Sequence, residues 1–221
     1  GQLLALGYFA SQDPQKLAAE INLAIQGKYD ADIPDQAIQW SGMHSYNAGD
    51  YTSAAKSLAL VANPEEPRET AKEIWRYLAK ARLETGDAEG ALLAVNHVLE
   101  VEDNPGWKAD GLLDRGRALI LLKRYAEARK AADEAEELRP QGRTSAGLRI
   151  LSGDLNSQAK QFDLAGADYL NVISFHEDKD LKPLAIWKYI QVLIDQGKTN
   201  EVEKYRLQLK NEFPDWTEPT H

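Results

Sequence analysis

The chain has 221 residues, of which 43% are hydrophobic and 28% charged, and its formal net charge is −9. This apolar content is too high for a disordered chain, no apolar run reaches the roughly 18 residues that span a bilayer, and the acidic balance argues against nucleic acid as a partner. There is no cysteine, which excludes disulfides, a thiol nucleophile and Cys-ligated metal sites.

A register of 37 residues organises the chain. Steps of 37 from Gly49 reach polar breaks between helix-like runs, at Gln12, Gly49, Gly86, Lys123, Lys160 and Gly197. The four internal units carry Gly or Ala seven residues before and five residues after each break, as at Gly116 and Ala128. Small residues let two helix backbones approach closely, so each break is predicted to be the turn of an αα-hairpin in which such a pair meets.

The predicted hairpins form a single array along the chain. They cover residues 1–30, 35–67, 70–105, 108–140, 144–178 and 182–213, and a C-terminal tail follows at 214–221. Apolar residues recur at helical spacing within them, as in AKEIWRYLAKARLE at 71–84, and nothing alternates with period two for long enough to indicate a strand. The first hairpin lacks the start of its leading helix, so we expect the natural chain to continue upstream. At the end of the chain, Phe213 and Trp216 are predicted to fold back over the last hairpin, and the alternative is a mobile tail that docks elsewhere.

Two segments, IQWSGMHSYNAGDYTSAA at 38–55 and IWRYLAKARLETGDAEGAL at 74–92, resemble tetratricopeptide repeats (TPRs). The pattern is matched in the third unit by Trp75, Leu78, Ala79, Gly86, Asp87 and Ala91, and in the fourth by Gly116, Tyr125, Ala128 and Pro140. The resemblance covers essentially the whole chain. It implies an all-α fold, a right-handed α-solenoid of about six helical hairpins, whose first helices line a concave face.

The repeats are longer than the family's usual length of about 34 residues. Such lengthened repeats resemble those of bacterial cell-envelope proteins, including outer-membrane assembly lipoproteins. The resemblance therefore implies a bacterial protein and favours a periplasmic or cell-envelope location over the cytoplasm.

The sequence offers no pattern for catalysis or metal binding. The four histidines fall at different registers or in the tail, and no pair has the i, i+4 spacing of a helical metal site. The carboxylates of YDADIPD at 29–35 and HEDKD at 176–180 lack the glycine and spacing of a calcium loop, so both are interpreted as solvated linkers. There is no phosphate loop, nucleophile elbow or HExxH. We therefore predict no catalytic residue, no metal and no cofactor, and we do not expect an enzyme.

Ligand contacts in the TPR family come from the first helix of each hairpin. The corresponding positions, about ten, nine, six and three residues before each turn, predict a groove in the second to fourth hairpins formed by Gln39, Trp40, Met43, Tyr46, Arg76, Tyr77, Lys80, Leu113 and Arg117. Aromatic residues and arginine dominate binding energy at interfaces. We expect the aromatics to bury apolar groups of a peptide while Arg76, Lys80 and Arg117 pair with its carboxylates. The same aromatics can instead pack between hairpins.

The leading interpretation is therefore a non-catalytic scaffold that binds a protein or peptide. The alternative is a passive structural or assembly segment of a larger multidomain protein, and a third class is an all-α enzyme whose carboxylates meet across the concave face. Exposed aromatics in the groove would favour the first, an apolar face at an open end the second, and a deep pocket with perturbed carboxylates the third. No residue pattern identifies the partner or sets an oligomeric state.

Overall fold

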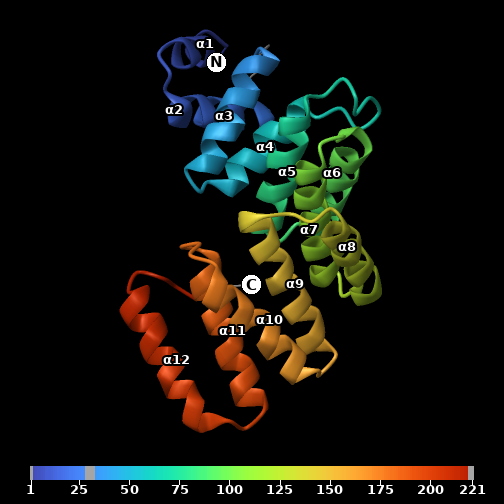
Figure 1. Ribbon diagram of the computed structural model, residues 1–221. Coiled ribbons are helices and arrows are strands. Elements are labelled where there is room, and N and C mark those ends of the chain that lie inside the picture. The colour runs from blue at the N-terminus through green and yellow to red at the C-terminus, as the bar shows by residue number, and fades with distance from the viewer. Residues whose placement is uncertain (1, 28–32, 219–221) are drawn as a thin grey trace. The chain divides into compact units, whose positions relative to one another are not determined.

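The computed structural model describes residues 2–27 and 33–218, and all regular structure in these residues is helical (Figure 1). The predicted all-α fold class is confirmed. Residues 28–30 of the predicted first hairpin, most of the segment YDADIPD and the last three residues of the tail lie outside the described residues. The described helices are α1 (Gln2–Ala10), α2 (Pro14–Ile25), α3 (Asp35–Asn47), α4 (Tyr51–Val61), α5 (Lys72–Glu84), α6 (Ala88–Val101), α7 (Pro105–Leu121), α8 (Tyr125–Glu137), α9 (Gly142–Gln158), α10 (Phe162–Phe175), α11 (Leu181–Asp195) and α12 (Thr199–Glu212).

The turn inside each hairpin is built around one residue in the left-handed region of backbone conformation. These residues are Gln12, Gly49, Gly86, Lys123, Lys160 and Gly197, and they stand at the six breaks predicted from the sequence. In the second hairpin, the N–H groups of Gly49 and Asp50 donate to the carbonyls of Tyr46 and Ser45 at 3.0 and 2.9 Å. The Asp50 carboxylate then accepts the N–H of Ser53 at 3.0 Å and caps α4. Gly-Asp thus closes one helix and starts the next.

The left-handed positions give a direct test of the turns. A Cβ added at Gly49 meets nothing within 4 Å, so Gly49→Ala acts only through its φ of +82°. We expect it to lower the free energy of unfolding by about 1 kcal/mol. Lys123→Gly is the matched variant because Lys123 already has a φ of 59°, and it should leave stability unchanged or raised. Urea denaturation followed by circular dichroism measures both. Equal stability of Gly49→Ala and its parent would contradict the turn assignment.

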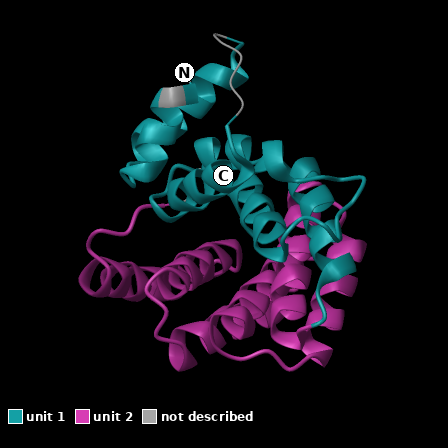
Figure 2. Ribbon diagram, turned by 90° about the horizontal axis from the view of Figure 1, so that it is seen from above, with its two compact units in different colours: residues 1–103 teal, residues 104–221 magenta. Residues whose placement is uncertain are grey.

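The contacts divide the chain into two compact units, unit 1 over residues 1–103 and unit 2 over residues 104–221 (Figure 2). The boundary lies where α7 begins, at Asn104, whose side chain accepts the N–H groups of Gly106 and Trp107 at 2.9 and 3.1 Å. In unit 1 the first helices of neighbouring hairpins touch, α1 on α3 and α3 on α5. In unit 2 the equivalent pairs are α7 on α9 and α9 on α11. Each unit is therefore a stack of three hairpins.

Two glycines of the repeat register, Gly42 and Gly116, lie against leucine side chains. A Cβ added at Gly42 would lie 2.7 Å from Cγ of Leu58, and one added at Gly116 would lie 2.5 Å from Cδ2 of Leu151. The sequence predicts that Gly116 and Ala128 meet where α7 and α8 cross, and this contact stays a prediction, whereas the atoms nearest to an added Cβ at Gly116 belong to Leu151. Leu151 belongs to the next hairpin, so Gly116 gives room for the packing of α7 on α9 within unit 2.

The end of α12 leads into the tail. Phe213, the residue directly after α12, packs against the unit 2 core together with Tyr205 and Leu209, and the fold-back of Trp216 stays a prediction. Trp216 is half-buried, and its backbone N–H donates to the carbonyl of Phe213 at 3.1 Å.

The Asp178 carboxylate accepts hydrogen bonds in the turn before α11, and its ionisation makes the stability of the fold depend on pH. Burial works to raise its pKa, but hydrogen bonds from the N–H groups of Leu181 and Asp180 and from Arg143 outweigh burial, so the pKa of Asp178 lies below its usual value. A lowered folded-state pKa contributes stability above the ordinary pKa of about 3.8, and this stability is lost as pH falls through the lowered value.

We therefore expect Asp178→Ala to cost about 1 kcal/mol of unfolding free energy at neutral pH, because the α11 turn loses its cap. The cost should shrink at acid pH, where the parent carboxyl is itself protonated. Urea denaturation at pH 7 and at the lowest pH where the parent still folds measures the difference. An equal cost at both pH values would show that the charge of Asp178 has no part in the turn.

Candidate functional site

Four aromatic side chains on the first helices of unit 1 form two edge-to-face pairs. Phe9 of α1 lies 5.6 Å from Trp40 of α3 between ring centroids, with the ring planes at 73°. Tyr46 of α3 lies 5.1 Å from Tyr77 of α5, with the planes at 84°. Phe9 and Tyr46 are 37 residues apart, and so are Trp40 and Tyr77. The second pair therefore repeats the first, one hairpin further along, and we call these four residues the aromatic ladder.

The rings of the ladder are partly buried and partly exposed to solvent. All four are half-buried. Phe9 and Trp40 pack against the core of the first hairpin and α3, while Tyr77 packs against the core around Trp75 and Leu78. The two interpretations that the sequence left open, packing between hairpins and exposure to a ligand, therefore apply to the same rings.

Further side chains of the predicted groove surround the ladder. Met43 is half-buried against the core that also contacts Tyr77, and Gln39 is half-buried beside Trp40 in the sequence of α3. The Trp40 ring also lies 4.3 Å from that of His44, and the Tyr46 ring lies 5.2 Å from that of Tyr51. The structure thus brings the aromatic part of the predicted set together within unit 1.

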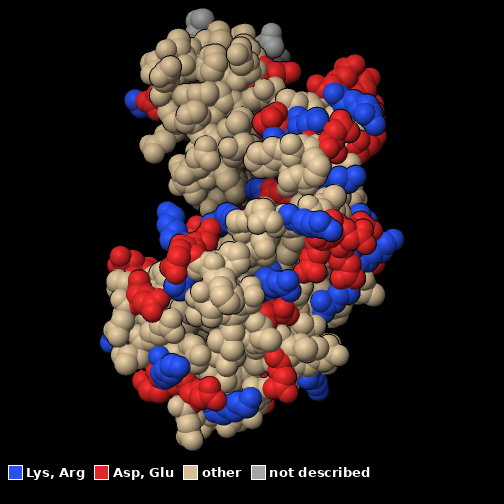
Figure 3. All heavy atoms as spheres, in the orientation of Figure 1, with Lys and Arg blue, Asp and Glu red and all other residues tan. Residues whose placement is uncertain are grey.

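The central helix of this surface carries almost no charge. Asp35, in the first turn, is the one Asp, Glu, Lys or Arg in α3, whereas α5 has six such residues. In the space-filling view, uncharged atoms dominate the surface over α1–α4, and charged atoms gather beside it (Figure 3). Depletion of charge together with aromatic residues and Met is the composition that marks the centre of protein interfaces.

The predicted role of Arg76 is not supported by its surroundings. Its Nη1 donates to Oε2 of Glu102 at 2.7 Å and its Nη2 to Oε1 of Glu73 at 2.9 Å. The side chain of Arg76 is 13% exposed and that of Glu102 is 3% exposed. Since both donors already pair with carboxylates of unit 1, Arg76 stabilises α5 against the end of α6. Lys80 is half-buried on the same helix.

The remaining predicted residues lie in unit 2. Leu113 is 8% exposed, and a Cβ added at Gly147 would lie 2.6 Å from its Cδ2. The prediction of Leu113 as a groove residue is therefore corrected, because its side chain packs on α9. Arg117 has a side chain 45% exposed, and its Nη1 lies 3.6 Å from Oδ1 of Asp114.

Phe9 is the member of the ladder that the predicted set omits. The signal was present in the register, because Phe9 stands three residues before its turn, as Tyr46 does. The partners Trp40 and Tyr77 both stand nine residues before theirs. A pair is therefore identified by an aromatic residue three residues before the turn of one hairpin and another nine residues before the turn of the next.

In unit 2 an ion pair joins two of the first helices. Asp154 of α9 and Lys188 of α11 form an ion pair at 2.8 Å, and the Tyr169 hydroxyl donates to the same carboxylate oxygen at 2.7 Å. Burial and the neighbouring Asp154 raise the pKa of Tyr169 far above its usual value, so this hydroxyl stays protonated. The arrangement joins α9, α10 and α11.

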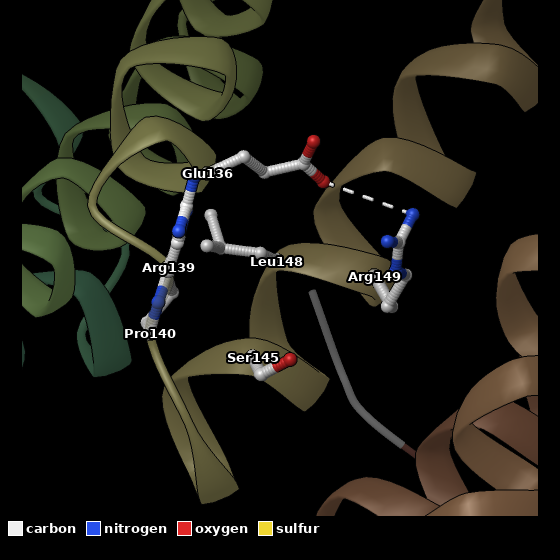
Figure 4. Close-up of a pocket in the computed structure, with 6 residues that line it drawn as sticks. All are labelled: Glu136, Arg139, Pro140, Ser145, Leu148 and Arg149. Atoms are coloured by element: carbon white, nitrogen blue, oxygen red, sulfur yellow. Dashed lines mark ion pairs between the residues drawn. The ribbon is translucent and has the colours of Figure 1, made fainter.

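A hollow of about 200 Å³ opens between α8 and α9 in unit 2 (Figure 4). Arg149 lies 3.7 Å from Glu136 and 3.7 Å from Asp168, whose pKa is raised by burial. The hollow is smaller than the roughly 300–1,000 Å³ of most small-molecule sites, and Arg149 is paired within the protein. Its lining residues are Glu136, Arg139, Pro140, Ser145, Leu148 and Arg149.

Among the described residues, no group of three or more His, Asp or Glu side chains is placed to hold a metal ion. Across residues 2–27 and 33–218, no helix combines the length and the apolar character that crossing a bilayer requires.

Comparison with known proteins identifies the fold. No family model and no curated protein matches the sequence. The structure is similar to the crystal structure of a thermophilic TPR protein from Thermus thermophilus, with a TM-score of 0.64 and 19% sequence identity over 82% of this chain and 93% of that one. Together with six helical hairpins of matching pattern, this similarity shows that the chain has a TPR-like repeat fold.

Proposed function

We propose that the protein is a non-catalytic scaffold that binds a peptide or a protein segment on unit 1, with the aromatic ladder at the centre of the site. The observation that carries this proposal is the repeated ring pair on α1, α3 and α5, next to the nearly uncharged α3. A TPR-like fold supports an interaction role in general. An assembly segment of a larger protein is the alternative.

The ladder suits binding on energetic grounds. Aromatic side chains bury a large area for little loss of side-chain freedom, and the cores of unit 1 already hold Phe9, Trp40 and Tyr77. A ligand that covers the outer faces therefore gains apolar contact without ordering mobile side chains. Because Arg76 is paired internally, contact with the rings, Met43 and Gln39 supplies the affinity, in place of the ion pairs predicted from the sequence.

The test is selection of binders from a random peptide display library with the full chain, followed by affinity measurements on variants. Trp40→Ala is expected to weaken binding of the selected peptides by about tenfold or more. Trp187→Ala is the matched control, because Trp187 is a half-buried tryptophan on a first helix of unit 2. Selected peptides that bind parent and Trp40→Ala equally, or that lose affinity only with Trp187→Ala, would overturn the assignment of the site.

A further inference from the structure

We infer that the ligand of the aromatic ladder is an uncharged segment in the polyproline II conformation with a proline at every third position. This inference rests on the proposed function, since it names the ligand class of the same site. It follows from the spacing of the two ring pairs, from the charge of α3 and from the groups around the rings.

The distance between the two ring pairs is set by the repeat, because equivalent residues lie one hairpin apart. The two ring pairs are equivalent and are displaced from each other by one hairpin, from α1 and α3 to α3 and α5. Packed helices lie about 8–10 Å apart between axes, so equivalent points on the ladder recur at about that distance. A ligand that makes the same contact with both pairs needs equivalent side chains at the same interval.

The polyproline II helix supplies this interval. It has three residues per turn and rises about 3.1 Å per residue, so every third side chain returns to one face after about 9 Å. In a β-strand, side chains on one face recur at about 6.7 or 13 Å, neither of which matches. In an α-helix, residues seven apart recur after about 10.5 Å, close to this interval, but a helix is about 10–12 Å wide and presents fewer backbone groups to the rings than an extended chain does. The extended polyproline helix therefore fits the ladder best.

The charge distribution favours a neutral ligand. The second hairpin contains three charged residues between residues 33 and 61, namely Asp35, Asp50 and Lys56. None of them lies among the ladder positions, and Arg76 of α5 is neutralised by Glu73 and Glu102. A ligand carboxylate or ammonium group would lose hydration at the ladder, and α3, the central helix, offers no charged side chain other than Asp35 in its first turn. An uncharged segment avoids this cost.

The chemistry of proline suits this surface. Proline presents an apolar ring that packs on aromatic faces, and its fixed backbone loses little freedom on binding. Polyproline II carbonyls make no internal hydrogen bonds, so they can accept from donors on the protein. Gln39 and Tyr77 are half-buried residues whose side chains carry donors of this kind.

The probes are blocked synthetic peptides of about twelve residues, titrated into the full chain by calorimetry. One repeats Pro-Ala-Gln, which places a proline at every third position. A second has the same composition with its prolines paired, so that no two are three apart. A third is an α-helical peptide with an apolar residue at every seventh position. A fourth carries apolar and acidic residues, the ligand class predicted from the sequence.

We expect the first peptide to bind at least tenfold more tightly than the second, with an affinity that does not change between low and high salt. Tyr77→Ala should lower this affinity by about tenfold, and Tyr77→Phe, which keeps the ring, should keep most of it. Tighter binding of the third or fourth peptide, lost in Trp40→Ala, would overturn the proline inference and leave the proposed function standing. Failure of all four peptides, together with display-selected binders unaffected by Trp40→Ala, would overturn both.

Discussion

Replacing Gly153 by alanine is expected to lower the free energy of unfolding by about 2–3 kcal/mol. A Cβ at this position would lie 2.4 Å from Cε1 and 2.8 Å from Cζ of Tyr169, well inside contact distance. The ring cannot turn aside, because Tyr169 is 2% exposed and its hydroxyl donates to Asp154 at 2.7 Å. Either α9 and α10 separate or the buried hydrogen bond breaks, and each is costly in a packed core.

Gly7→Ala is the matched control for this substitution. Gly7 also lies within a helix, but a Cβ added there meets nothing within 4 Å. Alanine has the higher helix propensity, so Gly7→Ala should be neutral or stabilise by up to about 1 kcal/mol. Urea denaturation of both variants compares them directly. If Gly153→Ala unfolds at the same urea concentration as the parent, the packing of Tyr169 on α9 is not as described.

Glu102→Ala is expected to cost about 3 kcal/mol, the largest effect of a charge substitution in unit 1. Glu102 is buried and accepts from Arg76 at 2.7 Å, and Lys72 lies 3.4 Å from its other oxygen. Its removal leaves Arg76, with a 13% exposed side chain, short of one of its two carboxylate partners. Breaking a buried pair from one side is costly because the remaining charge stays desolvated.

Asp103→Ala provides the comparison for Glu102. The Asp103 carboxylate is fully exposed and lies 4.0 Å from the same Lys72. Exposed pairs contribute between 0 and about 1 kcal/mol, so this variant should be close to the parent. Thermal unfolding of the two variants is the measurement. Equal effects would show that burial of the Glu102–Arg76 pair contributes nothing to stability.

The turns and helix caps were predictable from the sequence because they depend on residues close together in the chain. The turns at Gly49 and Lys123 were predictable from breaks in helix-forming runs. The role of Asp50 as a cap was predictable because Asp is preferred at the start of a helix. Because these features repeat, the register placed them along the whole chain.

Contacts between distant side chains were not predictable in this way. Arg76 and Glu102 are 26 residues apart and meet only because α6 returns along α5. Leu151 covers Gly116 because one hairpin packs on the next, and Leu113 is buried by the same packing of α7 on α9. The environment of each predicted groove residue therefore depends on its neighbours in the stack, which the spacing along one helix does not specify.

We propose that the aromatic ladder of unit 1 is the binding surface. Fluorine NMR of the full chain labelled with fluorotryptophan tests it most directly, with each resonance assigned by replacing one tryptophan at a time. On addition of the tightest display-selected peptide, we expect the Trp40 resonance to shift while those of Trp187 and Trp216 in unit 2 stay in place. A bound peptide that moves the Trp187 or Trp216 resonance and leaves Trp40 unchanged would contradict the claim.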